Sequence, residues 1–193
     1  MNFGIFSFLK ELAKNPARTG SIAPSCDELC DLITDQAELN NIHTVIEFGP
    51  GTGVFTEKIM DKISVDTTFF ALELNPVFIE VTKKRCPGVI IYNDSAENSK
   101  KYLEMNGKSC CDCIISGLPW TAFGPALQDR LLETIWDILS PKGRFLTFSY
   151  SHSLLFPTAR RFRKRLKNIF PEVTESKTVW ANFPPAFVYC AKK

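Results

Sequence analysis

One glycine-rich segment, Glu47–Gly53, constrains the fold of this chain more than any other. It has an acidic residue followed by Gly at every second position, and it lies between the apolar run 43–48 and the helical pattern 54–63. Glycines let the backbone turn tightly and approach a ligand at a helix N-terminus. A strand, a glycine turn and a helix in this order predict the first unit of a parallel α/β sheet, with an adenosine-containing cofactor at the turn.

The rest of the chain continues the alternation of strands and helices. A helix that Asn75 caps begins at Pro76, and another spans 128–139. Residues 173–193 form two strand patterns separated by Pro184-Pro185, which predicts a reversed hairpin at the sheet edge. We therefore expect an α/β fold, a Rossmann-like sandwich of seven strands. Its first five strands, apolar enough to be covered on both faces, are predicted at 43–48, 67–73, 89–93, 113–116 and 143–149.

Size and composition predict a single domain over residues 1–193, because a chain of this length buries a core without disulfides or a structural metal. An N-terminal amphipathic helical extension (1–30) would cover the cofactor, and a Rossmann-like core would span 43–193. The seven cysteines are an odd number without a paired ligand spacing, so we expect a reducing cytosol and no metal site. No apolar run reaches the ~18 to 20 residues of a membrane span, and a net charge of +2 does not indicate bulk nucleic-acid binding.

Residues near the glycine turn distinguish between adenosine cofactors. A dinucleotide fingerprint would need a glycine where Val54 stands, and Glu47 would be a poor neighbour for a pyrophosphate. An acidic residue before this turn resembles the first motif of class I methyltransferases, whose ligand carries a sulfonium and an ammonium. Glu73, twenty residues after Gly53, stands where a carboxylate accepts hydrogen bonds from both ribose hydroxyls. Charge complementarity therefore favours S-adenosylmethionine over NAD.

A second polar turn follows the third predicted strand. Asp94, Ser95 and Ala96 stand where class I methyltransferases hold the adenine amine, although Asp and Ser are also ordinary turn formers. A solvated strand end is the corresponding alternative for Glu73. The full set of residues expected at the cofactor is Glu47, Gly49, Gly51, Thr52, Gly53, Glu73, Leu74, Asp94, Ser95, Ala96, Ser116 and Ser21.

The fourth predicted strand ends in the segment Ser116–Trp120, which resembles the Asn-x-Pro-Tyr motif of amine-directed methyltransferases. In base-modifying enzymes the Asn or Asp carbonyl accepts a hydrogen bond from an exocyclic amine, and Gly117 cannot supply that acceptor. Trp120 could hold an alkylammonium by a cation–π contact of roughly 0.5 to 2 kcal/mol, or pack under a lid. Tyr150 could orient the amine, with packing as an equal alternative. The expected acceptor is an aliphatic amine, and the expected catalytic residues are Trp120, Tyr150 and Pro119.

Two segments have the composition of membrane-surface helices. Near the N-terminus, Phe6 and Leu9 belong to an apolar face interrupted by charges. Residues 160–167 carry six basic side chains, and the aromatic residues among and beside them, Phe156, Phe162 and Phe170, could insert at headgroup depth. RNA phosphates would attract the same charges, and a solvated face on a packed helix is the third alternative. The expected membrane contacts are Phe6, Leu9, Arg160, Arg161, Arg163, Lys164 and Arg165.

Together these motifs resemble the bacterial phospholipid N-methyltransferases, including the related ornithine-lipid N-methyltransferases. The segments that carry the resemblance are 8–25, 47–56, 73–75, 116–119 and 182–188. The resemblance implies a cytoplasmic enzyme bound peripherally to the inner face of the membrane. It would use S-adenosylmethionine to methylate the primary amine of phosphatidylethanolamine or an aminolipid such as ornithine lipid. The cysteine-rich composition departs from the family pattern and leaves the lipid open.

Two other functions fit part of the pattern. A ribosomal-RNA adenine dimethyltransferase shares the fold and the fourth motif, but Gly117 and the lack of a helical RNA-binding domain after Lys193 disfavour it. A non-catalytic lipid-binding protein on the same scaffold would leave Glu47 and Glu73 without a purpose. We therefore expect an N-methyltransferase whose partners are an aminolipid and an anionic membrane surface, with no nucleic-acid partner.

Overall fold

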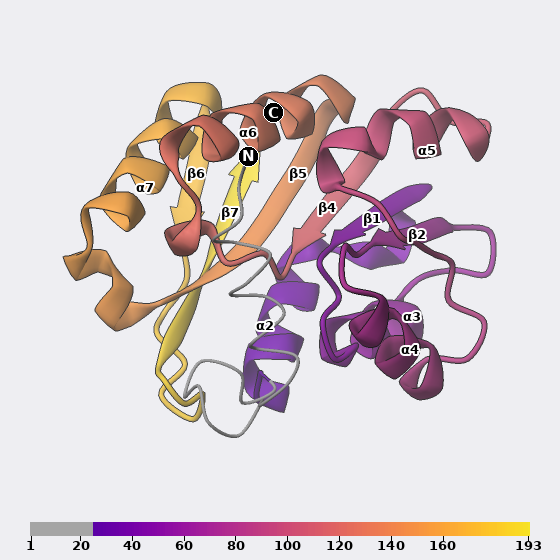
Figure 1. The fold of residues 1–193 in the computed structure, drawn as a ribbon, viewed down its shortest axis with the longest axis horizontal. Helices are drawn as coiled ribbons and strands as arrows, with labels where there is room; N and C mark the ends of the chain where they lie inside the picture. The colour runs from indigo at the N-terminus through magenta and orange to yellow at the C-terminus, as the bar shows by residue number, and fades with distance from the viewer. Residues whose placement is uncertain (1–24) are drawn as a thin grey trace.

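The computed structural model describes residues 25–193 and contains a seven-stranded sheet in the order β3-β2-β1-β4-β5-β7-β6 (Figure 1). The first five strands pair in parallel, and β7 pairs antiparallel with both β5 and β6. This confirms the predicted Rossmann-like sandwich with its reversed C-terminal hairpin. The predicted N-terminal contacts Phe6, Leu9 and Ser21 lie outside the described residues. The strands are β1 (Thr44–Phe48), β2 (Thr68–Leu72), β3 (Ile91–Tyr92), β4 (Cys111–Ser116), β5 (Leu139–Tyr150), β6 (Glu172–Glu175) and β7 (Ala186–Lys192).

Helices cover both faces of the sheet. Helices α5, α6 and α7 cover one face, and α2 and α3 cover the other, with α4 beside α3 (Figure 1). In β1, Ile46 belongs to the core under the first group and Val45 to the core under the second, because successive strand residues point to opposite faces. The α-helices in the described part are α2 (Asp27–Ala37), α3 (Val54–Lys62), α4 (Pro76–Arg85), α5 (Ser99–Met105), α6 (Pro125–Ile138) and α7 (Pro157–Ile169).

Two strands differ in length from the sequence-based expectation. β3 is confined to two residues, and β5 begins at Leu139 instead of residue 143. The chain passes directly from α6 into β5, with Lys142 in the left-handed region at φ 68°. The pairing of β4 with β5 shifts register between Cys111 and Cys113. Residues 140–142, between the predicted helix and the predicted strand, therefore belong to an irregular first part of β5.

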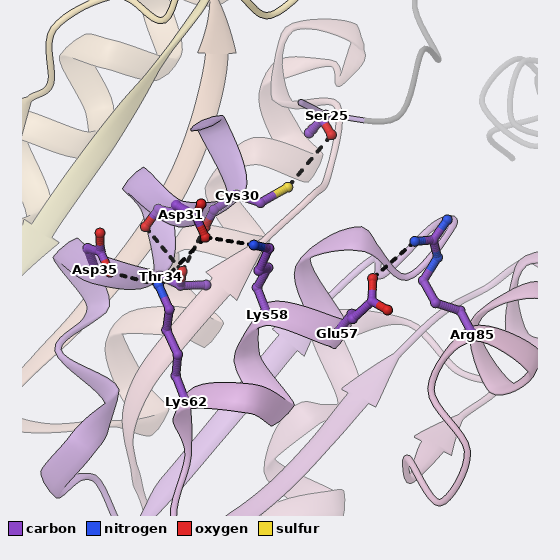
Figure 2. Close-up of polar contacts among 9 residues, drawn as sticks. All are labelled: Ser25, Cys30, Asp31, Thr34, Asp35, Glu57, Lys58, Lys62 and Arg85. Atoms are coloured by element: carbon purple, nitrogen blue, oxygen red, sulfur yellow. Dashed lines mark hydrogen bonds and ion pairs between the residues drawn. The ribbon is translucent and has the colours of Figure 1, made fainter. Parts of the chain in front are cut away.

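Ion pairs join α2 to α3, as Figure 2 shows. Lys58 and Lys62 extend from α3 to Asp31 and Asp35 of α2, at 2.9 and 2.7 Å. Lys62 also donates a hydrogen bond of 2.7 Å to Thr34 Oγ1. The carboxylates are exposed, so these pairs contribute little to stability beside the apolar core beneath them. They connect α2 to α3, which begins directly after the glycine turn.

Candidate functional site

A cavity of about 540 Å³ opens at the carboxyl ends of the parallel strands. The turns that follow β1, β2, β3, β4 and β5 all contribute to its wall, together with residues of α6 and α7. This is the edge at which open α/β sheets bind their ligands. The predicted site residues that line the cavity are Gly49, Gly51, Thr52, Glu73, Leu74, Asp94, Ser95, Ala96, Pro119, Trp120 and Tyr150.

The glycine turn needs glycine for two different reasons. Gly49 and Gly51 have φ of 69° and 59°, a region in which side chains are strained, and both line the cavity. Gly53, at φ 83°, precedes α3 and lies against α4, where an added Cβ would be 3.1 Å from Thr82 Cγ2. The first two glycines therefore shape the cavity wall, and Gly53 is required for helix packing.

Glu73 brings a buried carboxylate to the cavity wall. Its side chain accepts hydrogen bonds from the Gly51 amide at 3.3 Å and from the Asn75 amide at 2.9 Å. Burial raises the pKa of Glu73, and the hydrogen bonds from the backbone partly oppose that shift. The carboxylate thus links the glycine turn to the start of α4, whose predicted cap by Asn75 is confirmed by the bond from the Val77 amide.

The turn after β3 is held by the carboxylate of Asp94. Its oxygens accept hydrogen bonds from Asn98 Nδ2 at 2.8 Å, the Ser95 amide at 2.7 Å and the Tyr102 hydroxyl at 2.9 Å. The bond from Asn98 is the main reason that the pKa of Asp94 is lowered. Since both carboxylate oxygens already have donors, Asp94 positions Ser95 and Ala96 at the cavity wall.

Glu47 lies beneath the cavity and not in its lining. Strand alternation turns its side chain towards α3, where Oε2 accepts a 2.7 Å hydrogen bond from Thr56 Oγ1. Oε1 has no hydrogen-bond partner among residues 25–193. Burial raises the pKa of Glu47 to about 8. The side chain is therefore mostly protonated at neutral pH, so the argument from its negative charge does not hold for this geometry, and its contact with the cofactor stays a prediction.

The raised pKa of Glu47 has a measurable effect on stability. Between the ordinary carboxyl pKa of 4.5 and the folded value of about 8, the unfolded chain releases a proton that the folded chain retains. Folding stability should therefore fall as the pH rises through this window, by at most about 1.4 kcal/mol per pH unit. Glu47→Gln should remove this component in urea unfolding measured from pH 5 to 8. Glu80→Gln, at an exposed position of α4, is the control, and an unchanged pH slope in Glu47→Gln would contradict the assignment.

The turn after β4 brings the acceptor motif against the glycine turn. Ser116 is fully buried, and its Oγ accepts hydrogen bonds from the Leu118 amide and from Trp120 Nε1, both at 3.2 Å. A Cβ on Gly117 would lie 2.5 Å from the carbonyl oxygen of Gly49. Ser116 thus organises the motif without lining the cavity, and no side chain fits at position 117.

Trp120 is packed tightly into the cavity wall. It lines the cavity but is only 3% exposed, and its ring stacks on Phe162 with the centroids 4.7 Å apart. Its indole N–H is already bonded to Ser116. Trp120 can therefore offer a bound amine only its ring, as part of a fixed wall.

At the end of β5 the predicted residue Tyr150 lies beside cavity residues that the sequence did not reveal. Tyr150 lines the cavity, and its ring lies nearly parallel to that of His152, with 5.7 Å between centroids. Burial raises the pKa of Tyr150, so its phenol stays protonated at neutral pH. Ser149 and Ser153, whose hydroxyl oxygens are 2.9 Å apart, line the same wall. The sequence gives no motif for His152 or these serines; Ser149 belongs to β5, and His152 and Ser153 belong to η4 (Ser151–Leu155), which follows β5 directly.

Comparison with known proteins agrees with this geometry. Residues 27–98 match a family model described as ribosomal RNA adenine dimethylase. Over 190 residues the chain is 28% identical to ornithine lipid N-methyltransferase from Singulisphaera acidiphila, covering 95% of this chain and 93% of the relative. The fold is shared with N-methyltransferase NodS from Bradyrhizobium japonicum in complex with S-adenosyl-L-homocysteine (TM-score 0.66, 16% identity, 97% of each chain). It is also shared with an O-methyltransferase from Bacillus cereus in complex with SAH (TM-score 0.69, 12% identity, 98% of this chain and 90% of that one).

The protein is a class I S-adenosylmethionine-dependent methyltransferase. The charges of its cavity suit this cofactor. Among the described residues the lining holds three carboxylates, on Glu73, Asp94 and Glu97, and one guanidinium, on Arg130. Arg130 is paired with Glu97 at 2.6 Å. The excess of negative charge favours a ligand with a sulfonium and an ammonium over one with a pyrophosphate.

The basic helix of the methyltransferase is α7, and most of its charges are paired within the protein. Arg161 and Arg165 both bind Asp129 of α6, each at 2.7 Å. Arg163 binds Glu175 of β6 at 2.8 Å. These carboxylates are distant in sequence, which is why the pattern of residues 160–167 did not reveal them. Two acidic residues therefore relieve the repulsion within the cluster.

The apolar face of α7 packs against the protein core and not against lipid. Phe162 and Phe170 are buried in the core, so the prediction that they insert into lipid was wrong, whereas Phe156 is 54% exposed. Arg160 and Lys164 remain exposed and form no ion pair within residues 25–193. In the same part of the chain, no helix combines the length and hydropathy needed to cross a membrane.

Proposed function

We propose that the methyltransferase transfers methyl groups to the primary amine of a membrane lipid, phosphatidylethanolamine or an aminolipid such as ornithine lipid. In this proposal it works as a peripheral protein on the inner, anionic face of the cytoplasmic membrane. The observation that carries the proposal is the contact between Gly117 and the carbonyl of Gly49, which leaves no room for the Asn or Asp side chain that would hold a nucleobase amine. The likeness to an ornithine lipid N-methyltransferase supports it.

For this reaction the protein has to bind the cofactor and the amine, orient them and exclude water. The cofactor, when bound, supplies an electrophilic methyl group. An aliphatic amine has a localised lone pair, so it needs to lose its proton, shed water and line up with that methyl group. We assign orientation of the amine to the Tyr150 hydroxyl and the Trp120 ring, beside Pro119. Tyr150 is not assigned as the base, because burial raises its pKa.

We assign the cofactor to the wall formed by the glycine turn, the end of β2 and the turn after β3. Gly49, Gly51 and Thr52 offer backbone groups at close approach, and Glu73 offers a carboxylate to hydroxyl groups. Ser95 and Ala96 offer backbone groups from the turn after β3.

A second candidate is methylation of adenine in ribosomal RNA. The observation that favours it is the match of residues 27–98 to the ribosomal RNA adenine dimethylase model. That match covers all the residues assigned here to the cofactor wall, and the acceptor motif 116–120 lies outside it. Gly117, which has no side chain for a base amine, argues against this candidate.

Methyl transfer from labelled S-adenosylmethionine would test the proposal. We expect labelled lipid from vesicles that contain phosphatidylethanolamine or ornithine lipid together with an anionic lipid. Ribosomal RNA, offered separately, should stay unlabelled. A reaction without the protein supplies the background rate. Labelled RNA without labelled lipid would reject the proposal in favour of the second candidate.

A further inference from the structure

We propose that the methyltransferase docks on an anionic lipid bilayer through an apolar rim at the mouth of its cavity. This inference rests on the proposed function, because a bilayer would present the aminolipid at that mouth. The rim consists of Leu155, Phe156, Trp180 and Phe183.

The four apolar side chains of the rim are largely exposed to solvent. Leu155 is 74% exposed, Phe156 54%, Trp180 78% and Phe183 81%. Within residues 25–193 these include every exposed phenylalanine and tryptophan. Large aromatic side chains gathered on one edge indicate an interaction surface, whereas scattered single apolar residues do not.

The loop between β6 and β7 holds the two outermost aromatics in place. Between Trp180 and Phe183, Asn182 is only 4% exposed. Its Oδ1 accepts a 3.0 Å hydrogen bond from the Cys26 amide, and its Nδ2 donates a 2.7 Å bond to the Pro184 carbonyl. Trp180 and Phe183 therefore project from an anchored loop, so that docking would not need to order it first.

A hydrogen bond between the β6–β7 loop and the end of β5 places the rim beside the cavity. The Ser151 amide donates a 2.8 Å hydrogen bond to the Pro185 carbonyl, which joins the loop to the end of β5. Tyr150 and Phe156, on either side of this junction, line the cavity. In Figure 1 the β6–β7 loop lies at the lower edge of the molecule, the edge towards which β5 runs. A lipid in a bilayer that contacts the rim would have its head group next to the cavity mouth.

The charges around the rim favour an anionic bilayer as its partner. Arg160 and Lys164 of α7 and Lys177 of the β6–β7 loop are exposed cations without an ion pair in the described part of the chain. Four cations of α7 also line a hollow beside Leu154. Basic residues next to exposed aromatic residues are typical of proteins that lie at the headgroup level. A purely apolar protein partner would leave these cations without a counter-charge.

Vesicle sedimentation with the full chain tests the rim. Vesicles of phosphatidylethanolamine and phosphatidylglycerol should bind Trp180→Ser/Phe183→Ser about tenfold or more weakly than the parent, because two large side chains no longer leave water. Val65→Ser/Met105→Ser removes exposed apolar residues elsewhere and should bind normally. For charge, Arg160→Glu/Lys164→Glu should weaken binding more than Lys83→Glu/Lys84→Glu, which changes the net charge equally on α4.

Fluorescence gives a direct reading of the contact. Trp180 is the exposed tryptophan of the described part, so vesicles should shift its emission to the blue and protect it from acrylamide. The Trp180→Phe variant should lose that shift. Equal sedimentation of the rim variant and the parent would overturn the proposal. A parent dimer that the rim substitutions dissociate, without any effect on vesicles, would also overturn it by assigning the rim to a second copy of the chain.

A soluble short-chain aminolipid separates this inference from the proposed function. A rim variant that methylates it like the parent but fails on vesicles supports both. Rim-dependent vesicle binding without methylation of any aminolipid would support the docking surface and refute the proposed function.

Discussion

Replacing Gly117 by alanine is expected to reduce kcat/KM about 100-fold or more and to destabilise the fold by about 1 to 3 kcal/mol. The added Cβ would lie 2.5 Å from the Gly49 carbonyl oxygen, so either the acceptor turn or the glycine turn has to move. The Gly117 amide also donates a 2.8 Å hydrogen bond to the Phe48 carbonyl, which limits movement of the acceptor turn. A displacement of about 1 Å at a reacting centre can cost two orders of magnitude in rate. Steady-state kinetics and thermal unfolding measure the two effects.

Gly124→Ala is the matched control for this prediction. Gly124 precedes α6 with φ −67°, and an added Cβ would meet nothing within 4 Å. This variant should retain its activity and nearly all of its stability. If Gly117→Ala behaved like Gly124→Ala, position 117 would have room for a side chain, and the main argument against a nucleobase acceptor would fail.

The second large effect is expected at Glu73. Glu73→Ala should weaken the binding of S-adenosylmethionine by roughly 1.5 to 3 kcal/mol, or about 10-fold to 150-fold in Kd, which is the scale of lost hydrogen bonds to a charged group. The amides of Gly51 and Asn75 would also lose their acceptor. Titration calorimetry measures the change.

Two comparisons sharpen the prediction for Glu73. Glu133→Gln, at an exposed position of α6, should bind the cofactor normally. Because burial raises the pKa of Glu73, the parent should also lose affinity on acidification at a higher pH than an ordinary carboxyl group would require. Unaltered affinity in Glu73→Ala would show that this carboxylate does not contact the cofactor.

The sequence predicted the sheet because its signals are local. Apolar runs marked the strands, Asn75 and Pro76 marked the start of α4, and the glycines marked a turn that only they can form. The same reasoning placed Glu73 and Asp94 at strand ends, and parallel topology then brought both to the cavity. Local patterns and the rule that parallel strands end at one edge were sufficient for these residues.

The remaining features depend on contacts between distant segments. The hydrogen bond between Glu47 and Thr56 was not predicted from the glycine motif that contains Glu47. Asp129 and Glu175, which pair with the arginines of α7, carry no signal of that role in their own surroundings. The rim residue Trp180 lies in a segment without a motif. Each of these features depends on tertiary packing between distant segments, which the periodicity of the sequence does not reveal.

The negative charge of the cavity also bears on turnover. Methyl transfer converts a cationic sulfonium into a neutral thioether, so the carboxylates of Glu73, Asp94 and Glu97 attract the incoming cofactor more strongly than its spent form. Successive methylation of one amine requires the spent cofactor to leave and a fresh one to enter before each round. The electrostatics of the wall thus favour exchange in the productive direction.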